Sequence, residues 1–439
     1  MRFTLTIATI LFFIATSSGR AALSTSNTFS SKWSVLGGVG EVNDADALYL
    51  NPARLGEGAK SEMAAHFAAK FINSSGPLIT NNNYEGESVT TTDLALLWKM
   101  KLGNRWGIGL GHYPVAIWES SYPQVDMSVV ETSIYPWKAY QPSLHSYFDI
   151  DELALGASYR YSGNILLGVA FRATIAEADY SYLEYDQPTD PNNMVAVSLK
   201  EMSGSNWGGF SLGASYRPDS MRWGAGMLIR TPIQLTLQGL SSAVEQSALV
   251  ETNAQWEYGP QNATMKMELP LSISLGGQYY LAGGREIIFG TYNFINYAQA
   301  SKFSLEGESL LVFGSTREVI KGQEVLLHWN DFHQIKLGYQ IEKEGYELMG
   351  GYAITWPVAT DDGGNSQMAA PGFEHALSGG ASFPWSSGAG SLELSTEYSW
   401  IEGQNKKTPS AAENFQRTML EGDFSTEVIA FYLGARWRW

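Results

Sequence analysis

The chain ends with the residues Val428-Ile429-Ala430-Phe431-Tyr432-Leu433-Gly434-Ala435-Arg436-Trp437-Arg438-Trp439. The odd-numbered positions are all apolar and finish with two tryptophans, whereas the even-numbered positions carry both arginines. Because successive side chains of a β-strand point to opposite faces of a sheet, this stretch predicts a strand with one apolar and one polar face. Such a strand fits a transmembrane β-barrel, in which one face meets lipid and the other meets the lumen.

The same two-residue period recurs along the chain. Residues 153–161 and 165–175 alternate in this way on either side of the short turn Ser162-Gly163-Asn164. Counting such segments predicts an all-β fold, a transmembrane antiparallel β-barrel of about fourteen strands, with the even number that closed single-chain barrels of this class require. The expected strands are about 62–72, 93–101, 105–117, 147–161, 164–178, 206–217, 221–238, 266–281, 285–303, 331–342, 346–358, 373–384, 390–402 and 424–439.

The connections between these strands are of two kinds. Short turns such as Arg217-Pro218-Asp219-Ser220 alternate with long polar segments, among them 118–146, 180–206 and 240–265. Outer-membrane barrels have short turns at the periplasmic end and long loops at the extracellular end. The spacing therefore predicts the same two-sided arrangement here.

The composition narrows the class of protein. Among 439 residues there are 44 acidic and 28 basic side chains, which gives a net charge of −16. This balance excludes nucleic acid as a partner, because phosphate binding needs a basic surface. Charged residues make up only 16% of the chain, against about a quarter in soluble domains. Cysteine is absent, which excludes disulfides and a thiol nucleophile.

The beginning of the chain has the layout of a secretory signal peptide. A basic start at Arg2 is followed by an apolar run over 3–14 and by small residues that end at Ala21, as such peptides require. After it, no run of about 18 apolar residues could form a membrane-spanning helix. We therefore expect residues 1–21 to be removed on export.

Residues 22–60 lack the two-residue period of strands. Asn51 followed by Pro52 suits a helix cap and a first helical position. Backbone of this kind cannot lie in lipid, because its polar groups would be unsatisfied. We expect it either to plug the lumen or to hang in the periplasm. The expected parts are thus a signal peptide (1–21), an N-terminal hatch (22–60) and a barrel (61–439).

The stretch Glu41-Val42-Asn43-Asp44-Ala45-Asp46-Ala47-Leu48-Tyr49-Leu50-Asn51-Pro52-Ala53 resembles the N-terminal hatch signature of the FadL/TodX-type outer-membrane transport family. Further similar landmarks follow in order at 206–208, 212–218, 222–224, 268–270, 336–339 and 350–357. The resemblance implies a fourteen-stranded barrel in the outer membrane of a Gram-negative bacterium, with Asn51, Pro52 and Ala53 as the hatch motif. It also implies passive uptake of hydrophobic compounds, either long-chain fatty acids or hydrocarbons, without a cofactor.

The expected strand 105–117 contains Gly107, Gly109, Gly111 and Pro114. Alternating glycines remove the side chains from one face, and a proline cannot donate to the ladder, so we expect a bulge or a kink. In the family that the chain resembles, a kink in this strand opens a lateral route into the membrane. These four residues are therefore candidates for a lateral opening. The alternative is that the glycine face only makes room for the hatch.

Arg160, Arg172 and Arg230 have the parity of the lumen and are candidates for contact with the polar group of a ligand. Fatty-acid carriers of the family present basic side chains to the carboxylate, whereas the matching stretch here contains Glu177 and Asp179. A carboxylate buried beside these two groups would be unfavourable. The sequence therefore favours neutral hydrocarbons over fatty acids.

Other functions have less support from the residues. A general or substrate-selective porin would share the barrel but needs an open lumen. An acyl hydrolase would need Ser211 of the pattern Gly209-Phe210-Ser211-Leu212-Gly213, but this pattern lies within an expected strand and a nucleophile elbow needs a strand-to-helix turn. Neither His328 with His333 nor the acidic turn at Asp361 predicts a metal site. We expect no enzymatic activity.

Three kinds of partner follow from this interpretation. The first is a hydrophobic small-molecule ligand, and the second is the lipid and lipopolysaccharide of the outer membrane. The third is the barrel-assembly machinery, which would recognise the C-terminal strand that ends at Trp439.

Overall fold

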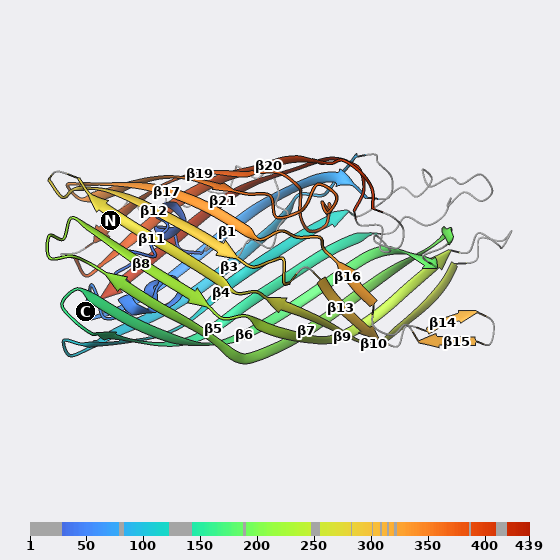
Figure 1. Ribbon diagram of the computed structural model, residues 1–439, viewed down its shortest axis with the longest axis horizontal. Helices are drawn as coiled ribbons and strands as arrows, with labels where there is room; N and C mark the ends of the chain where they lie inside the picture. The colour runs from blue at the N-terminus through green and yellow to red at the C-terminus, as the bar shows by residue number, and fades with distance from the viewer. Residues whose placement is uncertain are drawn as a thin grey trace, which may run out of the picture.

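The computed structural model describes residues 29–78, 83–122, 143–187, 190–246, 255–281, 283–300, 302–307, 310–313, 316–319, 323–385, 388–409 and 419–439. The expected signal peptide lies outside these residues. In the described part of the chain, the strands form a closed antiparallel β-barrel, which Figure 1 shows from the side. The described residues contain no helix with the length and apolar character needed to cross a bilayer.

The wall has fourteen strands in the described residues, of which ten run unbroken and four are interrupted. The unbroken strands are β1 (Ser61–Pro77), β3 (Val89–Leu102), β4 (Trp106–Tyr122), β5 (Leu144–Arg160), β6 (Ile165–Gln187), β7 (Asp190–Tyr216), β18 (Tyr346–Thr355), β19 (Glu374–Trp385), β20 (Gly390–Asn405) and β21 (Gly422–Arg438). The interrupted strands are β8 (Trp223–Arg230) with β9 (Ile233–Gln246), β10 (Gln255–Leu269) with β11 (Ser272–Tyr280), β12 (Glu286–Ile295) with β13 (Lys302–Gly307), and β16 (Gln323–Leu326) with β17 (Phe332–Lys343).

Pairing of the first strand with the last closes the ring. β21 and β1 pair from Glu62↔Arg438 to Ser75↔Ser425. The short strand β2 (Asn83–Glu85) pairs with the end of β1, and β14 (Leu310–Phe313) with β15 (Thr316–Val319) forms a separate hairpin. The predicted fold, an antiparallel barrel of fourteen strands, is confirmed.

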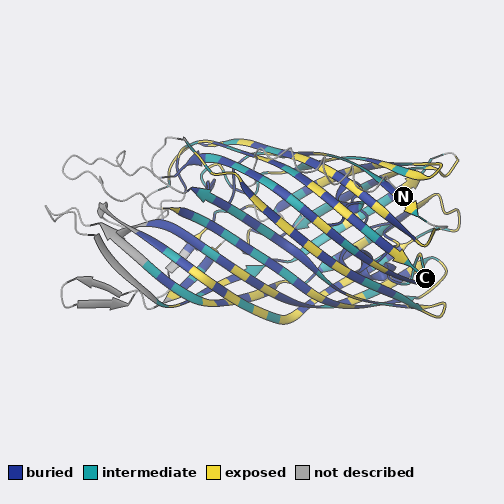
Figure 2. Ribbon diagram, turned by 180° about the vertical axis from the view of Figure 1, so that it is seen from behind, coloured by how far each residue is buried: buried dark blue, intermediate teal, exposed yellow. Residues whose placement is uncertain are grey.

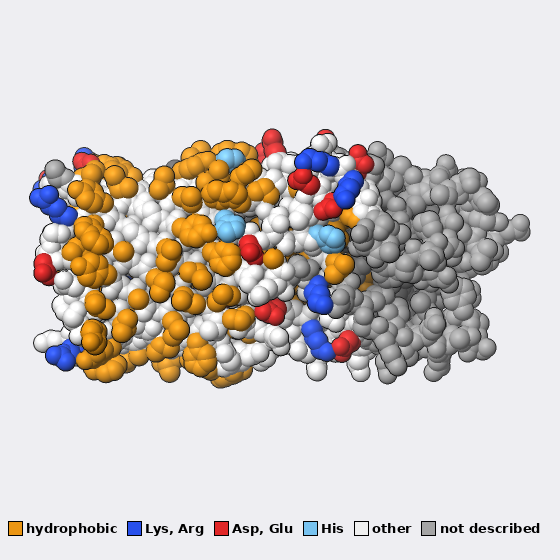
Figure 3. Space-filling model, viewed as in Figure 1, with side chains coloured by type: hydrophobic (Ala, Val, Ile, Leu, Met, Phe, Trp, Pro, Cys, Tyr) orange, Lys and Arg blue, Asp and Glu red, His pale blue; other side chains and the backbone are white. Residues whose placement is uncertain are grey.

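The two faces of the wall alternate as the sequence predicts. On β21 the side chains of Phe431, Leu433 and Trp437 are 40–44% exposed on the outer surface, while Tyr432 and Arg436 are buried. Figure 2 shows the same alternation of buried and exposed residues along the other strands. On the face seen in Figure 3, hydrophobic side chains gather on the outer surface, and charged ones lie mainly at one end and in a band next to the residues drawn in grey. A surface of this kind fits lipid.

Several strands extend further than the sequence predicts. β6 and β7 pair as far as Gln187↔Asp190, so the expected loop 180–206 is mostly ladder. β9 and β10 likewise pair through much of the expected loop 240–265. Most of the third expected loop, 118–146, lies outside the described residues. A strand can be recognised in the sequence by its apolar alternation only where one face meets lipid. Strand pairing uses backbone groups alone, so the ladder continues beyond that region, where the sequence shows no such pattern.

Two expected strands, 221–238 and 266–281, are each broken at a proline. The breaks fall at Pro232 and Pro270, because proline has no N–H to give to the ladder. The inward side chains beyond these breaks are Ile233, Leu235, Leu237, Met265 and Met267. This part of the lumen is therefore filled by aliphatic and thioether groups.

Residues 29–60, called the N-terminal segment below, lie inside the barrel at the end where Trp439 is found (Figure 1). The segment contains the short helices α2 (Trp33–Leu36), α3 (Ala47–Leu50) and η1 (Pro52–Arg54), and the residues of all three are buried. It makes contacts with strands on many sides of the ring. Of the two expectations for this part of the chain, the position inside the lumen fits the described residues.

Glycines of the wall let the N-terminal segment approach closely. A Cβ added to Gly338 of β17 would lie 2.8 Å from Leu36 Cα. On the nearly opposite strand β5, a Cβ added to Gly156 would lie 2.7 Å from Leu48 Cδ1. The wall and the segment are thus fitted to each other at positions where a larger side chain would collide.

Candidate functional site

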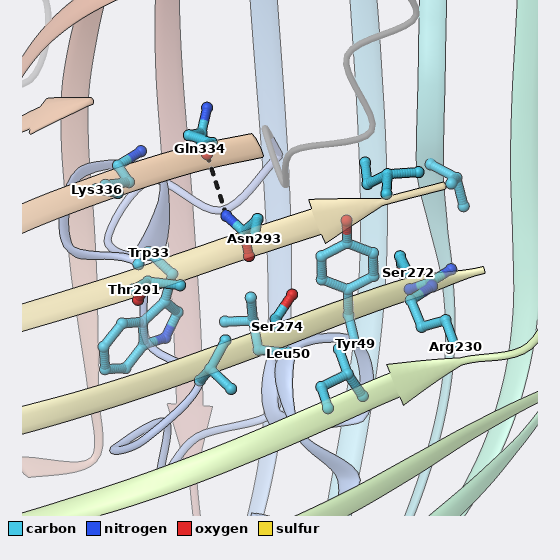
Figure 4. A pocket seen from close by; sticks show the side chains of 15 residues that line it. Trp33, Tyr49, Leu50, Arg230, Ser272, Ser274, Thr291, Asn293, Gln334 and Lys336 are labelled. Carbon is cyan, nitrogen blue, oxygen red and sulfur yellow. Dashed lines mark hydrogen bonds between the residues drawn. The ribbon is translucent and has the colours of Figure 1, made fainter. Parts of the chain in front are cut away.

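A cavity of about 80 Å³ lies in the lumen between the N-terminal segment and the wall. Figure 4 shows Trp33, Tyr49 and Leu50 of the segment beside polar residues of the wall. The polar lining residues from β8, β11, β12 and β17 are Arg230, Ser272, Ser274, Thr291, Asn293, Gln334 and Lys336. An apolar side facing a few polar groups is typical of sites for small ligands.

The volume limits what the cavity can hold as it stands. An engineered apolar cavity of about 150 Å³ in another protein binds benzene, whereas this cavity measures about 80 Å³. Even a single aromatic ring therefore needs some lining side chains to move. Tyr49 and Leu50 belong to the N-terminal segment, so binding in the cavity and the position of the segment are linked.

Two of the predicted arginines meet at one buried carboxylate beside the cavity. Arg172 Nη1 lies 2.6 Å from Glu152 Oε1, and Arg230 Nη2 lies 2.5 Å from Glu152 Oε2. Arg172 Nη2 also donates to the backbone O of Thr231 at 2.7 Å, next to the break between β8 and β9. All three charged groups are buried, and buried charges are retained only when they are paired. The two guanidinium groups and one carboxylate leave a net charge of +1.

Arg230 is the member of this group that lines the cavity. Its guanidinium carbon lies 4.9 Å from the ring centre of Tyr49, which is within the range of a cation–π contact. Its Nη1 has no hydrogen-bond partner among the described residues, and the same holds for the buried hydroxyl of Tyr113. An unpaired buried donor is costly, so these groups could each donate a hydrogen bond to the oxygen of a ligand in the cavity.

The third predicted arginine lies elsewhere. Arg160 pairs with Glu57 at the rim of the barrel, and its side chain is 35% exposed. The sequence prediction thus places Arg172 and Arg230 correctly in the lumen but misses Glu152, which joins them. Glu152 has an even number on β5, and the odd-numbered residues of that strand face lipid. The two-residue period could therefore have predicted that Glu152 faces the lumen.

The expectation that Glu177 and Asp179 face the ligand is wrong. Both lie on the outer side of β6, together with Ile175, because the alternation of faces continues along this strand. Glu177 is exposed, and Asp179 Oδ1 accepts a hydrogen bond from the backbone N of Glu201 at 2.7 Å. Neither carboxylate faces the lumen, so neither disfavours a fatty acid there.

The glycines of β4 face the N-terminal segment. A Cβ added to Gly109 would lie 2.7 Å from Leu55 Cδ2, and one added to Gly107 would collide with the backbone of Gly56. Gly111 has the same parity on this strand. This placement fits the alternative in which the glycine face makes room for the hatch, and a role in lateral opening stays a prediction.

Pro114 marks the place where β4 separates from β3. The pairing of β4 with β5 shifts register between Pro114 and Ala116, so the expected irregularity at this proline is confirmed. Pairing of β4 with β3 ends at Leu96↔His112, just before the proline.

Beyond this point each strand pairs only with its other neighbour. β3 continues along β1 as far as Val89, and β4 continues along β5 as far as Tyr122. Residues 89–95 and 113–120 therefore have no ladder between them, and we call this interruption the β3–β4 gap. At a rise of about 3.3 Å per residue, the gap is about 20 Å long.

Side chains and one hydrogen bond border the β3–β4 gap. The backbone N of Glu87 donates to the backbone O of Ser121 at 2.8 Å, at the far end of the gap from Pro114. Val115, within the gap, also lines the cavity. Between residues 89–95 and 113–120, no ladder hydrogen bond joins the two strands in the described part of the chain.

Comparison with known proteins supports one fold. No family model matches the chain, and no curated protein matches it in sequence. A FadL homologue from Pseudomonas aeruginosa has a TM-score of 0.72 at 14% identity, over 96% of this chain and 99% of that chain. The Pseudomonas putida toluene transporter TodX has a TM-score of 0.71 at 14% identity, over 96% and 98%. The CymD monoaromatic hydrocarbon channel has a TM-score of 0.65 at 14% identity, over 94% and 97%.

The chain has the FadL/TodX-type fold. At this level of identity the likeness shows the fold alone, and it confirms the fold that the stretch Glu41–Ala53 implied. The three similar proteins are a FadL homologue, a toluene transporter and a monoaromatic hydrocarbon channel.

Within this FadL/TodX-type barrel, the motif Asn51-Pro52-Ala53 begins η1. Asn51 Oδ1 accepts a hydrogen bond from the backbone N of Ala53 at 3.2 Å, which confirms the expected cap. Asn51 Nδ2 donates to the backbone O of Val39 at 2.8 Å and of Ala214 at 3.1 Å. The motif therefore ties the N-terminal segment both to itself and to β7.

The motifs considered for catalysis and metal binding lie in other settings. Ser211 is buried within β7, so the strand-to-helix turn of a nucleophile elbow is not formed around it. Asp361 pairs with Lys406 on the surface. Among the described residues, no group of three or more His, Cys, Asp or Glu is placed to hold a metal ion.

A buried ion cluster around Arg436 of β21 anchors the N-terminal segment. Arg436 Nη2 lies 2.7 Å from Asp46 Oδ2, and its Nη1 lies 3.2 Å from Asp44 Oδ2. Its Nε lies 2.7 Å from Glu393 Oε1 of β20. His66 Nε2 contacts Asp46 Oδ1 at 2.9 Å. Burial alone would raise the pKa of Asp46, but Arg436 and His66 hold that pKa well below its ordinary value.

The substitution Arg436→Met tests this anchor. It leaves buried carboxylates without their counter-charge, a change that costs about 3–5 kcal/mol in other proteins. We expect the N-terminal segment to loosen, so that the variant conducts ions steadily in planar bilayers where the wild type is nearly silent. Lys266→Met is the matched control, because it removes a basic side chain whose ion pair with Glu306 is about half exposed on both sides. Equal conductance of Arg436→Met and the wild type would count against the anchor.

Proposed function

We propose that this chain is a transporter of the Gram-negative outer membrane for the passive uptake of hydrophobic compounds, with lateral release into the membrane. The FadL/TodX-type fold and the apolar outer face support the location and the general class. The β3–β4 gap, with a cavity-lining residue in it, is the observation that carries the proposal. Outer-membrane lipid and lipopolysaccharide would then surround the barrel, and the assembly machinery would recognise β21, which ends beside Trp439.

The N-terminal segment argues for a plugged lumen. In this proposal it is the described part of a hatch that comprises residues 22–60. A general or selective porin needs a continuous aqueous path, whereas the segment is buried among wall strands in that part of the lumen. An acyl hydrolase finds no support at Ser211. A plugged barrel needs another exit for its substrate.

Hydration favours a sideways exit for an apolar substrate. Each buried CH₂ group that enters water costs about 0.8 kcal/mol. A sixteen-carbon chain that left through an aqueous periplasmic mouth would face a barrier on the order of 10 kcal/mol. Passage between β3 and β4 leads from the cavity to lipid without this exposure. Because no ladder hydrogen bonds join the two strands there, only side chains have to move.

Cross-linking across the β3–β4 gap tests the exit. Thr92→Cys and Ile117→Cys place one thiol on each border of the gap in a chain that has no cysteine of its own. Joining them with a short reversible cross-linker should lower uptake of radiolabelled toluene by about tenfold, because the two strands can no longer part. Reduction should restore uptake.

The matched control uses the paired part of the same two strands. Leu96→Cys with His112→Cys joins residues that are already register partners, so cross-linking them should leave uptake unchanged. If the Thr92–Ile117 cross-link also leaves uptake unchanged, the lateral exit is wrong.

The polar side of the cavity bears on the substrate. Arg230 presents an unpartnered Nη1 to the lumen, and Lys336 lines the same cavity. We propose that Arg230 receives the oxygen-bearing end of a fatty acid, while the apolar part packs against side chains such as Leu50 and Val115. The reason for preferring neutral hydrocarbons is gone, since Glu177 is on the outer face.

A pair of substitutions separates the two substrate classes. Arg230→Gln should weaken oleate binding by about tenfold, the scale of one charge-assisted hydrogen bond, and leave toluene binding unchanged. Arg172→Gln is the matched control, because Arg172 shares Glu152 but does not line the cavity. Calorimetry of both ligands on both variants measures this. Equal losses for oleate and toluene would show that Arg230 supports the structure and not the ligand.

A further inference from the structure

The connection between β18 and β19 folds into the barrel. Residues 359–372 of this connection, called the strap below, lie toward the end of the barrel away from the N-terminal segment (Figure 1). Residues 363–371 are all buried, although connections between strands normally run over the surface. The contacts of the strap explain this burial.

The strap forms hydrogen bonds with strands across the lumen. Ser120 Oγ of β4 donates to the backbone O of Gln367 at 3.1 Å, and Tyr122 OH donates to the backbone O of Ser366 at 3.0 Å. Gln367 Nε2 donates to the backbone O of Ser181 on β6 at 2.7 Å. In the ring of fourteen strands β6 stands seven places from β19, so the strap spans the lumen.

On its own side the strap is held at its base by a two-way amide pair. Gly364 N donates to Asn405 Oδ1 at 2.9 Å, and Asn405 Nδ2 donates back to Gly364 O at 2.8 Å. Asn405 is the last residue of β20, the neighbour of β19. Each bond across the lumen depends instead on one side chain that can rotate away. Ser366 Oγ also donates to the backbone O of Pro77 on β1 at 2.7 Å. Residues 366 and 367 of the strap are thus held at β1, β4 and β6 by side-chain hydrogen bonds, whereas Asn365 next to the base forms a backbone bridge with Met419.

Ser366 and Gln367, called the tip of the strap below, are attached to β4, which is one of the two strands that border the β3–β4 gap. Ser120 is the gap residue of β4 furthest from Pro114, and Tyr122 follows it. Val115, which lines the cavity, lies about 16 Å from Ser120 at the rise of a strand. A compound that comes from the end of the barrel with the strap therefore meets the strap before it meets the cavity.

We propose that the strap is a second closure of the lumen, on the extracellular side, and that its tip must leave β1, β4 and β6 before a hydrophobic compound reaches the cavity. This inference rests on the proposed transport function. The tip also contacts Ser120 and Tyr122 near the end of β4. Its release therefore opens access to the cavity, and the same movement loosens the β4 border of the β3–β4 gap. Intake and lateral exit are thus coupled through β4.

A disulfide tests whether the strap has to move. The chain has no cysteine, so Gly76→Cys with Ser366→Cys introduces a single pair, and a Cβ at Gly76 would touch Ser366 Oγ. Oxidation ties the strap to β1 and should lower uptake of radiolabelled toluene and oleate by about tenfold or more. Dithiothreitol should restore uptake.

The control disulfide joins two wall strands and not the strap. Ser75 of β1 and Ser425 of β21 are register partners whose hydroxyl oxygens lie 2.9 Å apart, so Ser75→Cys with Ser425→Cys tests whether a disulfide near Gly76 by itself disturbs uptake. Oxidation of this pair should leave uptake unchanged. Equal uptake by the oxidised and reduced forms of the Gly76–Ser366 pair, with the disulfide formed, overturns the strap proposal and leaves the transport proposal standing.

Thiol labelling follows the strap without any transport. In a Val115→Cys background, a membrane-impermeant maleimide added from outside should react about fivefold faster when Gln367→Ala removes the bond to β6. Lys406→Ala, which removes an exposed ion pair with Asp361, should leave the rate unchanged. The uptake test gives no answer if the wild type takes up neither toluene nor oleate, or if the reduced disulfide variant does not insert into the membrane. In that case the labelling rates alone test the strap proposal. Equal rates with and without Gln367→Ala then overturn the strap.

Discussion

The ion cluster around Arg436 joins the N-terminal segment to the last strand of the wall, and the interior of the barrel depends on it. One guanidinium on the last strand contacts Asp44 and Asp46 of the N-terminal segment and Glu62 and Glu393 of the wall. A buried carboxylate is stable only when its charge is matched. The N-terminal segment therefore binds next to Arg436. Because residues of the segment line the cavity, the position of the segment also determines the shape of the cavity. Glycines of the wall then make room for the backbone that the cluster holds in place.

A plugged lumen closes the path along the barrel axis, whereas a hydrophobic substrate needs an exit. An opening in the wall of the barrel would satisfy both conditions. Backbone groups in lipid must be paired, so a barrel has few places where two strands can part. One such place follows Pro114, where β4 loses its ladder with β3 but keeps its ladder with β5. The lumen nearby offers Arg230 and Tyr113 with unpartnered polar atoms among the described residues. A cavity with one polar corner thus lies beside a part of the wall where two neighbouring strands have no ladder between them.

Local pattern predicts the wall well and the interior poorly. Each wall residue faces either lipid or lumen, so a two-residue period is enough to find β21 and to place Arg172 and Arg230 inward. The same rule, applied along β6, would have put Glu177 outside and avoided the error over substrate charge. Other features depend on partners that are distant in the sequence. The strap looks like an ordinary polar loop, because its burial comes from strands on the far side of the ring, and Glu152 acquires its role only from the two arginines that converge on it.

Photolabelling tests the central claim, that a hydrophobic compound leaves the lumen sideways between β3 and β4. A diazirine-bearing alkane is supplied from outside to the protein in native membranes, activated during uptake, and its adducts are mapped by mass spectrometry. The account predicts adducts in the cavity at Val115 and on the lipid side of the gap at Leu94. It predicts none above background at the periplasmic rim, where Lys60 and Arg217 lie. Adducts at the rim during uptake, with Leu94 unlabelled, would contradict it.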